Sequence, residues 1–284
     1  MKNSLTKNRR GLTSTDLKTI ALVLMVLDHL HYFFEFTGMV PVWFSMLGRL
    51  SAPLFLFCTA EGFAHTHDRR AYVFRIWLIG GGMGAVEFFM QYAGALRRGD
   101  GFFPMNAIFQ CFFLLCLVWQ GWDWLRQKRF LPGAAVIAAV VGWPIFVVWF
   151  TGLFPALLNP TAFLACSFLP AWNLITDGGW FFLLGGVLLY PLRGNRRIQA
   201  GVWALWTVVT EFGFVWLSAR TMPGFVWTKM FTDYFEWFSV FAAVLMLCYN
   251  GRRGRGHKAF FWLFYPAHVY LFYGLSCLLY TAMR

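Results

Sequence analysis

One short stretch of the chain concentrates ionisable side chains that could do chemistry, the sequence VLDHLHYFFE at residues 26–35. It places Asp28, His29, His31 and Glu35 inside an otherwise apolar segment. Burying ionisable groups in such a segment is costly, so each one marks a candidate functional site. A metal site, a proton path and a general base, for which a histidine oriented by an acid is well suited, are the functions to weigh.

Helical geometry argues against a shared metal ion in this stretch. Residues two apart in a helix point to opposite sides, so His29 and His31 cannot ligate one ion. His31 and Glu35 are four residues apart and could offer two ligands, but an obvious third ligand is lacking. The six cysteines lie in apolar runs without the CxxC spacing of metal sites. We therefore expect no metal.

A single arginine, Arg49, lies inside the next apolar segment, and its depth matches that of Asp28. At a rise of about 1.5 Å per residue, Asp28 lies roughly 17 Å from the inner end of its segment. Arg49 lies roughly 10 Å from the outer end of the following one. Because either charge alone is unfavourable at low dielectric, we predict an Asp28–Arg49 ion pair. A purely structural lock between two helices is the alternative.

The elements that must position these residues are membrane-spanning helices. The 284 residues are 59% hydrophobic and only 13% charged, whereas soluble domains are about a quarter charged. Apolar runs of about 20 residues recur throughout, so the sequence predicts an all-α, polytopic helical bundle in a lipid bilayer. We expect one transmembrane domain over residues 1–284 with a short basic tail at 1–16. About nine spans, within a range of eight to ten, are expected at 17–37, 42–64, 75–93, 102–121, 131–151, 161–192, 199–218, 232–249 and 259–280.

The basic residues predict the orientation of these spans. Most of the 24 Lys and Arg residues fall between spans on the side of the N-terminus, which the positive-inside rule makes cytoplasmic. This topology accounts for the net charge of +12, so nucleic acid is not an expected partner. The segment 161–192 is too long for one straight helix, and LPAWNLITDGG interrupts it. We expect a half-helix or a re-entrant piece there.

A second group of polar residues lies at the predicted inner membrane surface, in AEGFAHTHDRRAYVFR at residues 60–75. Glu61 and His65 are one helical turn apart and share a face. The arginines that follow, together with NGRRGRGHK at 250–258, could bind a phosphorylated cytosolic ligand, because Arg suits bidentate phosphate contacts. Topology and anionic lipid are the alternative explanation for these arginines.

Further polar residues lie inside other predicted spans. His268 follows Pro266 in the inner half of the last span, within FWLFYPAHVY. A lone histidine among aromatic residues is more often a hydrogen-bonded core residue than a catalyst. Glu87, Asn106 and Glu211 lie in three other spans, each with weaker individual support.

The ordered set of motifs resembles the TraX family of bacterial membrane proteins. The resemblance runs through LKTIALVLMVLDHLHYF, LGRLSAPLFLFCTAEGFAHTHDRRAYVFRIWL, MNAIF, TDGGWFFLLGGVLLYPLR and CYNGRRGRGHKAFFWLFYPAHVYLFYG. It implies a multi-pass acyltransferase of the bacterial inner membrane, because the namesake is linked to N-acetylation of the amino terminus of pilin. It also implies acetyl-CoA or another acyl-CoA as co-substrate. The acceptor is then an amine or hydroxyl of a peptide, a pilin or a small molecule.

Carried onto this sequence, the resemblance supports roles for particular residues. His29 is the expected general base, and Asp28 either orients it or pairs with Arg49. His268 is the second candidate, as base or as oxyanion donor, and Asn106 is expected to polarise the acyl carbonyl. Glu61, His65 and Glu87 are expected as structural or charge partners, and acyl-CoA is expected to bind Arg75, Arg69, Arg70, Asn250, Arg252, Lys258 and Tyr265.

Two other function classes stay open at the level of sequence. A proton-coupled transporter would use Asp28, Glu61, Glu87 and Glu211 as a relay, although the sequence shows no internal repeat of the kind common in transporters. A non-catalytic partner in pilus assembly would bind without turnover.

Overall fold

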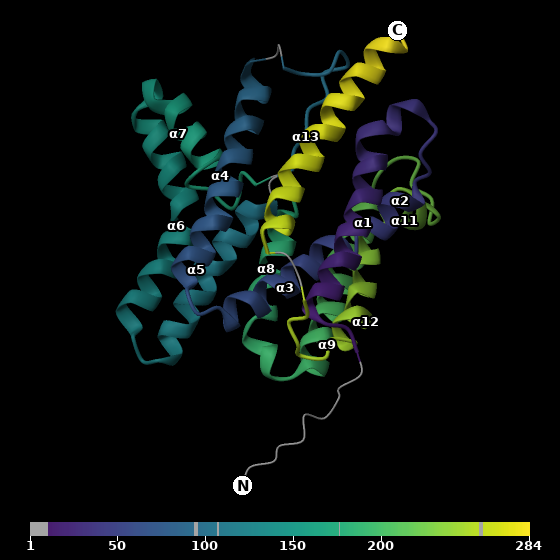
Figure 1. Cartoon of the computed structure of the whole chain (residues 1–284). Helices are drawn as coiled ribbons and strands as arrows, with labels where there is room; N and C mark the ends of the chain where they lie inside the picture. Colours follow the sequence, from purple (N-terminus) through teal and green to yellow (C-terminus); the bar gives the residue numbers. More distant parts are fainter. Residues whose placement is uncertain (1–10, 94–95, 107, 176, 256–257) are drawn as a thin grey trace.

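The computed structural model describes residues 11–93, 96–106, 108–175, 177–255 and 258–284, and within these it is all-helical, as predicted (Figure 1). Seven helices in the described residues are long and apolar enough to cross a membrane. The chain is therefore a polytopic membrane protein, and its described residues contain seven such helices where about nine spans were expected. The seven are Ser14–Thr37, Trp43–His65, Arg69–Tyr92, Ile108–Arg126, Phe130–Leu153, Arg196–Ala219 and Phe260–Ala282.

The helical elements run in order along the chain, and the start of α1 and the end of α13 lie at opposite ends of the molecule (Figure 1). Short 3-10 or π segments join several of them. The α-helices are α1 (Ser14–Phe34), α2 (Trp43–Gly48), α3 (Ser51–His65), α4 (Arg69–Ala93), α5 (Ile108–Arg126), α6 (Phe130–Leu153), α7 (Leu158–Cys166), α8 (Gly179–Leu189), α9 (Arg196–Thr207), α10 (Val215–Ala219), α11 (Lys229–Thr232), α12 (Ala242–Leu247) and α13 (Lys258–Ala282).

Two of the predicted spans are broken in the structure. The segment 161–192 divides into the end of α7, an irregular stretch and α8, which begins at Gly179; Gly178 and Gly179 are both at positive φ. The segment 232–249 contains only a 3-10 turn and the short helix α12. The predicted interruption of 161–192 is thus confirmed, and its carbonyl groups find side-chain donors. Gln110 Nε2 donates to Cys166 O at 2.6 Å, and Trp77 Nε1 donates to Phe168 O at 2.7 Å, as broken backbone at membrane depth requires.

Helix α1 places the central residues of the site. It begins at a capping box, in which Thr13 Oγ1 accepts from Asp16 N and the Asp16 side chain accepts from Thr13 N. Its buried residues recur every four positions, at Leu17, Ala21, Met25, His29 and Phe33. This spacing keeps one face of the helix towards the core, so the helical period itself buries His29.

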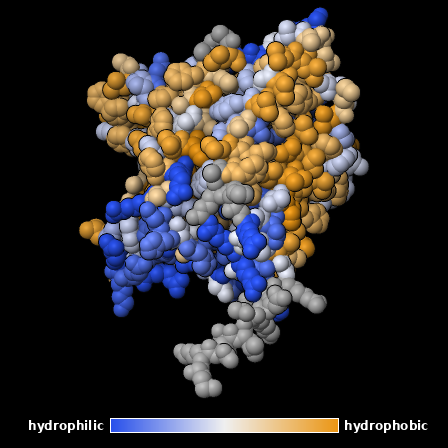
Figure 2. Space-filling model, viewed as in Figure 1, coloured by the Kyte–Doolittle hydropathy of each residue, from blue (hydrophilic) through white to orange (hydrophobic). Residues whose placement is uncertain are grey.

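Hydrophilic residues gather at the lower end of the molecule, beside the start of α1, while hydrophobic residues cover much of the upper part (Figure 2). At this polar end Asp123 of α5 is buried and accepts from three side chains. Arg69 Nη1 lies 2.8 Å and Arg193 Nη2 3.4 Å from its carboxylate oxygens, and Tyr190 Oη donates to it at 2.8 Å. The cluster ties the start of α4 and the end of α8 to α5.

Replacing Asp123 with alanine should destabilise the protein. The substitution leaves two arginines and a buried phenol without their shared acceptor, and we expect a loss of about 2 kcal/mol because both arginines are partly exposed. Thermal unfolding in detergent micelles measures the effect. Asp233→Ala, at an exposed carboxylate, should change stability by less than about 0.5 kcal/mol, and equal melting temperatures for the two variants would contradict the prediction.

Candidate functional site

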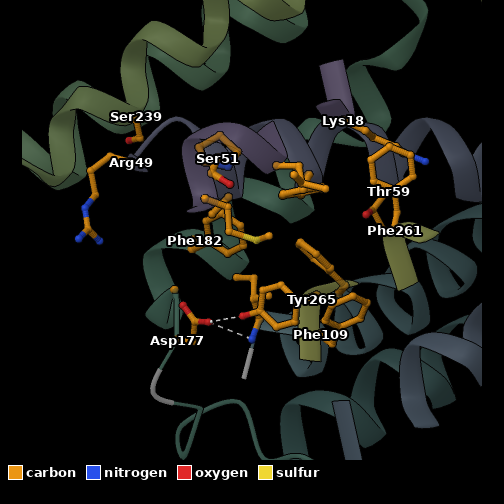
Figure 3. Close-up of a pocket in the computed structure, with 18 of the residues that line it drawn as sticks. Lys18, Arg49, Ser51, Thr59, Phe109, Asp177, Phe182, Ser239, Phe261 and Tyr265 are labelled. Atoms are coloured by element: carbon orange, nitrogen blue, oxygen red, sulfur yellow. Dashed lines mark hydrogen bonds between the residues drawn. The ribbon is translucent and has the colours of Figure 1, made fainter. Parts of the chain in front are cut away.

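A large cavity with a volume of about 960 Å³ lies within the helical bundle. Lys18 and Phe261 lie on one side of it, Arg49 and Ser239 lie on the other, and Tyr265 lies between them (Figure 3). The volume is near the upper end of the range for small-molecule sites. The wall combines apolar and aromatic side chains with a limited number of polar groups, as such sites do.

Two buried histidines from opposite ends of the sequence meet beside this cavity. His29 of α1 is 5% exposed and His268 of α13 is 4% exposed. The Nδ1 atom of His29 lies 2.5 Å from Nε2 of His268. On the far side, His268 Nδ1 lies 2.9 Å from the carbonyl oxygen of Phe264. On the near side, His29 Nε2 lies 3.2 Å from Nδ2 of Asn106.

These contacts determine which ring nitrogens carry protons when both imidazoles are neutral. A carbonyl oxygen only accepts, so Nδ1 of His268 must donate to Phe264, and Nε2 of His268 is then an acceptor. Nδ1 of His29 must therefore donate to His268, which leaves Nε2 of His29 unprotonated. The amide of Asn106 accordingly donates to this nitrogen.

The two histidines differ in their access to the cavity. His29 and Asn106 both lie in its wall, whereas His268 is not among the residues that line it. Tyr265, one turn before His268, also lines the cavity and places its ring edge against the ring of His29 at a centroid distance of 6.2 Å. A molecule in the cavity can therefore reach Nε2 of His29, while His268 supports that ring from behind.

The predicted ion pair of the first two spans is present. Arg49 Nη2 lies 3.4 Å from Asp28 Oδ1, and a Cβ atom at Gly48 would overlap the Asp28 side chain, so glycine permits this close approach of α2 to α1. Of its two expected roles, Asp28 thus takes that of partner of Arg49. The neighbour that orients His29 is His268 instead.

Charge partners also surround the polar end of the cavity. Glu61 is buried and lies 3.8 Å from Arg196 Nη2, and His65 Nδ1 contacts the Glu61 carbonyl oxygen at 2.9 Å. Both residues line the cavity, as does Arg75. Glu87 does not; it borders a small hollow behind Asn106.

Several residues expected to bind acyl-CoA lie elsewhere. Arg69 is bound to Asp123, away from the cavity wall. The Asn250 side chain donates to Gly11 O at 2.8 Å and accepts from Arg252 N at 2.9 Å, so it shapes the loop before α13. Arg70, Asn250 and Arg252 are absent from the described cavity lining, and the side chain of Lys258 lies outside the described residues.

The structure places in the cavity wall residues that had no individual role in the predicted site. Lys18 lines the cavity, and so does Arg253 from the predicted basic stretch 250–258. The place of Lys18 follows from helical geometry, because it precedes His29 by about three helical turns and therefore shares its face. Asp177 also lines the cavity and accepts from Ile108 N at 3.1 Å and from Tyr265 Oη at 3.5 Å. It lies in the irregular stretch before α8, where no helical period predicts the direction of a side chain.

A double-mutant cycle should detect the ion pair. Arg49→Ala and Asp28→Ala should each lower the melting temperature in detergent, and the double variant should be more stable than additivity predicts by about 1 kcal/mol, because the pair is half-buried. The matched cycle of Asp28→Ala with Arg220→Ala, an exposed arginine, should be additive. Intact folding and activity in Arg49→Ala would contradict the assignment.

Comparison with known proteins bears on the identity of this site. The family model described as TraX protein matches residues 13–276, nearly the whole chain. No curated protein and no solved structure matches it. Within the residues that the structure describes, no group of three or more His, Cys, Asp or Glu side chains could hold a metal ion. The matched region contains the histidine pair and the cavity wall, and the chain belongs to the TraX family.

Proposed function

We propose that this protein is an acyltransferase of the bacterial inner membrane that moves an acyl group from acyl-CoA to an amine or hydroxyl acceptor. Acetyl-CoA is the first donor to test, since the family is associated with acetylation of the amino terminus of pilin. One observation carries the proposal: His29, whose hydrogen bonds leave Nε2 unprotonated when both rings are neutral, lines a cavity of about 960 Å³. A nitrogen in this state is a general base ready for use.

The basic end of the cavity, formed by Lys18, Arg75 and Arg253, suits the phosphates of a CoA thioester. Arg75 is exposed near the start of α4. Arg253 lies beside the start of α1, where its carbonyl oxygen accepts from Thr15. Guanidinium and ammonium groups bind phosphate oxygens by charge-assisted hydrogen bonds. The thioester would extend from these residues towards His29.

The histidine pair then supplies the proton transfers. The N–H or O–H of the acceptor replaces the Asn106 amide at Nε2 of His29 and passes its proton to this nitrogen as the new C–N or C–O bond forms. The C–S bond of the thioester breaks, and the thiolate takes the proton back from His29. Throughout, the bond from His29 Nδ1 to His268 holds the ring in place and shares the transient positive charge.

The proton-relay alternative receives less support from the ionisable groups. Asp28 is paired with Arg49, and Glu61 with Arg196. Both carboxylates are therefore committed to contacts with arginines. Base catalysis needs only a neutral imidazole at His29, whose hydrogen bonds leave Nε2 without a hydrogen.

Release of free thiol from acetyl-CoA by the purified protein tests the proposed reaction. His29→Ala should lower the rate by about 10²–10⁴-fold, the usual contribution of a general base, while the protein still inserts into the membrane. His67→Ala, at an exposed histidine outside the cavity, is the matched control. Wild-type turnover by His29→Ala would refute the assignment of the base, and no thiol release from the wild-type protein with any peptide or amine acceptor would refute the function.

Loss of a basic side chain from the cavity should act on donor binding. Arg75→Gln and Lys18→Gln should each raise KM for acetyl-CoA by about tenfold, because each removes a charge-assisted hydrogen bond to phosphate. The kcat should change little. Arg126→Gln, which removes an exposed arginine outside the cavity wall, should leave KM unchanged, and equal KM values for all three variants would contradict the assignment of the basic end.

A further inference from the structure

Tyr32 lies on the same face of α1 as His29, nearly one turn further along, and it also lines the cavity. Its ring packs edge-on against Phe33 and Phe102, with centroid distances of 5.0 and 5.1 Å. The ring of His29 is 6.3 Å away. These contacts hold the phenol in one position beside the proposed base.

The Tyr32 hydroxyl accepts a hydrogen bond but has no described partner for its own hydrogen. A phenol accepts hydrogen bonds at its oxygen and donates one through its own hydrogen. Its oxygen accepts from Met105 N at 3.3 Å, and among the described residues no acceptor is seen for its hydrogen. Met105 precedes Asn106 directly, so the same contact places the phenol next to the amide that binds His29.

Acyl transfer creates a need for such a donor. As the acceptor attacks, negative charge develops on the acyl oxygen, and donors aimed at this oxygen stabilise the transition state. Asn106, the expected donor, gives one N–H to Nε2 of His29 in the structure, and it becomes available beside Tyr32 when the acceptor takes this place. The hydroxyl of Ser51, another residue of the wall, donates to Ala21 O at 2.8 Å. Tyr32 therefore carries an uncommitted donor close to the base.

We infer that Tyr32 is a catalytic residue whose hydroxyl donates a hydrogen bond to the acyl carbonyl oxygen. The inference rests on the proposed acyl transfer and assigns the oxyanion to the outer side of His29. The phenol keeps its proton, so the balance of the reaction is unchanged. The bond from Met105 N polarises the phenol oxygen and strengthens its O–H as a donor, because successive hydrogen bonds reinforce one another.

Tyr32→Phe tests this role because it removes the hydroxyl and keeps the packed ring. We expect kcat for acyl transfer from acetyl-CoA to fall by about 10²–10³-fold, the usual effect of losing one oxyanion donor, with KM for acetyl-CoA changed by less than about threefold. A loss confined to the transition state lowers kcat and kcat/KM together. Tyr92→Phe, at an exposed tyrosine outside the cavity, is the control.

Replacing Tyr32 with fluorotyrosine distinguishes a donor to the acyl oxygen from a residue that only accepts the hydrogen bond of Met105 N. Ring fluorine makes a phenol a stronger donor and a weaker acceptor. A donor to the oxyanion therefore predicts a higher kcat than with tyrosine, measured below the pH at which the fluorophenol ionises. An anchor that only accepts from Met105 predicts a lower kcat.

The outcomes distinguish this inference from the function on which it rests. Absence of thiol release by the wild-type protein contradicts the proposed acyl transfer itself. An active wild-type protein whose Tyr32→Phe variant keeps its kcat, or whose fluorotyrosine variant is slower, overturns the role of Tyr32 alone. Loss of kcat in Tyr32→Phe together with a gain on fluorination supports it.

Discussion

The hydrogen bond between His29 and His268 is the interaction on which the site depends. It joins the first and the last membrane helices at a distance of 2.5 Å, and both rings are buried. Its direction is set by a backbone carbonyl, that of Phe264, which can only accept. When both rings are neutral, Nε2 of His29 at the cavity therefore carries no hydrogen and accepts from the Asn106 amide. A backbone group that contacts no ligand thus defines the chemistry of the site.

Several charged side chains of the bundle are paired with a group of opposite charge. Arg49 forms an ion pair with Asp28, and Arg196 forms one with Glu61. Asp123 pairs with two arginines at the polar end. Each pairing reduces the cost of holding a charge at low dielectric. The other Lys and Arg side chains at the cavity wall, those of Lys18, Arg75 and Arg253, have no carboxylate partner among the described ion pairs. They can therefore serve an incoming anion.

Sequence reasoning predicted those parts of the site that follow a regular period. Burial of His29, the depth match of Asp28 with Arg49 and the all-helical fold follow from helical geometry and composition, and the structure agrees with each. The His29–His268 contact was not predicted, because no rule of local sequence brings α1 to α13. Both histidines had been selected as alternatives, and the structure joins them.

The errors have a common physical origin. Counting apolar runs gave about nine spans because composition does not reveal where the backbone breaks, as it does at Gly178. The clusters of basic residues suggested phosphate-binding sites. The sequence could not show that Arg69 forms an ion pair with Asp123, which lies far along the chain. Asp177 lies within the motif TDGG that supports the family resemblance, but its place in the cavity wall could not be predicted, because in irregular backbone the direction of a side chain depends on tertiary contacts alone.

The protonation state of the two imidazoles tests the central claim most directly. Nitrogen chemical shifts of His29 and His268, assigned by comparison with single-histidine variants of the isotope-labelled protein in micelles, report which ring nitrogens carry hydrogen. The account predicts neutral rings at neutral pH, with hydrogen on Nδ1 of both and a free Nε2 on His29. A His29 ring protonated at Nε2, or protonated at both nitrogens, would contradict it.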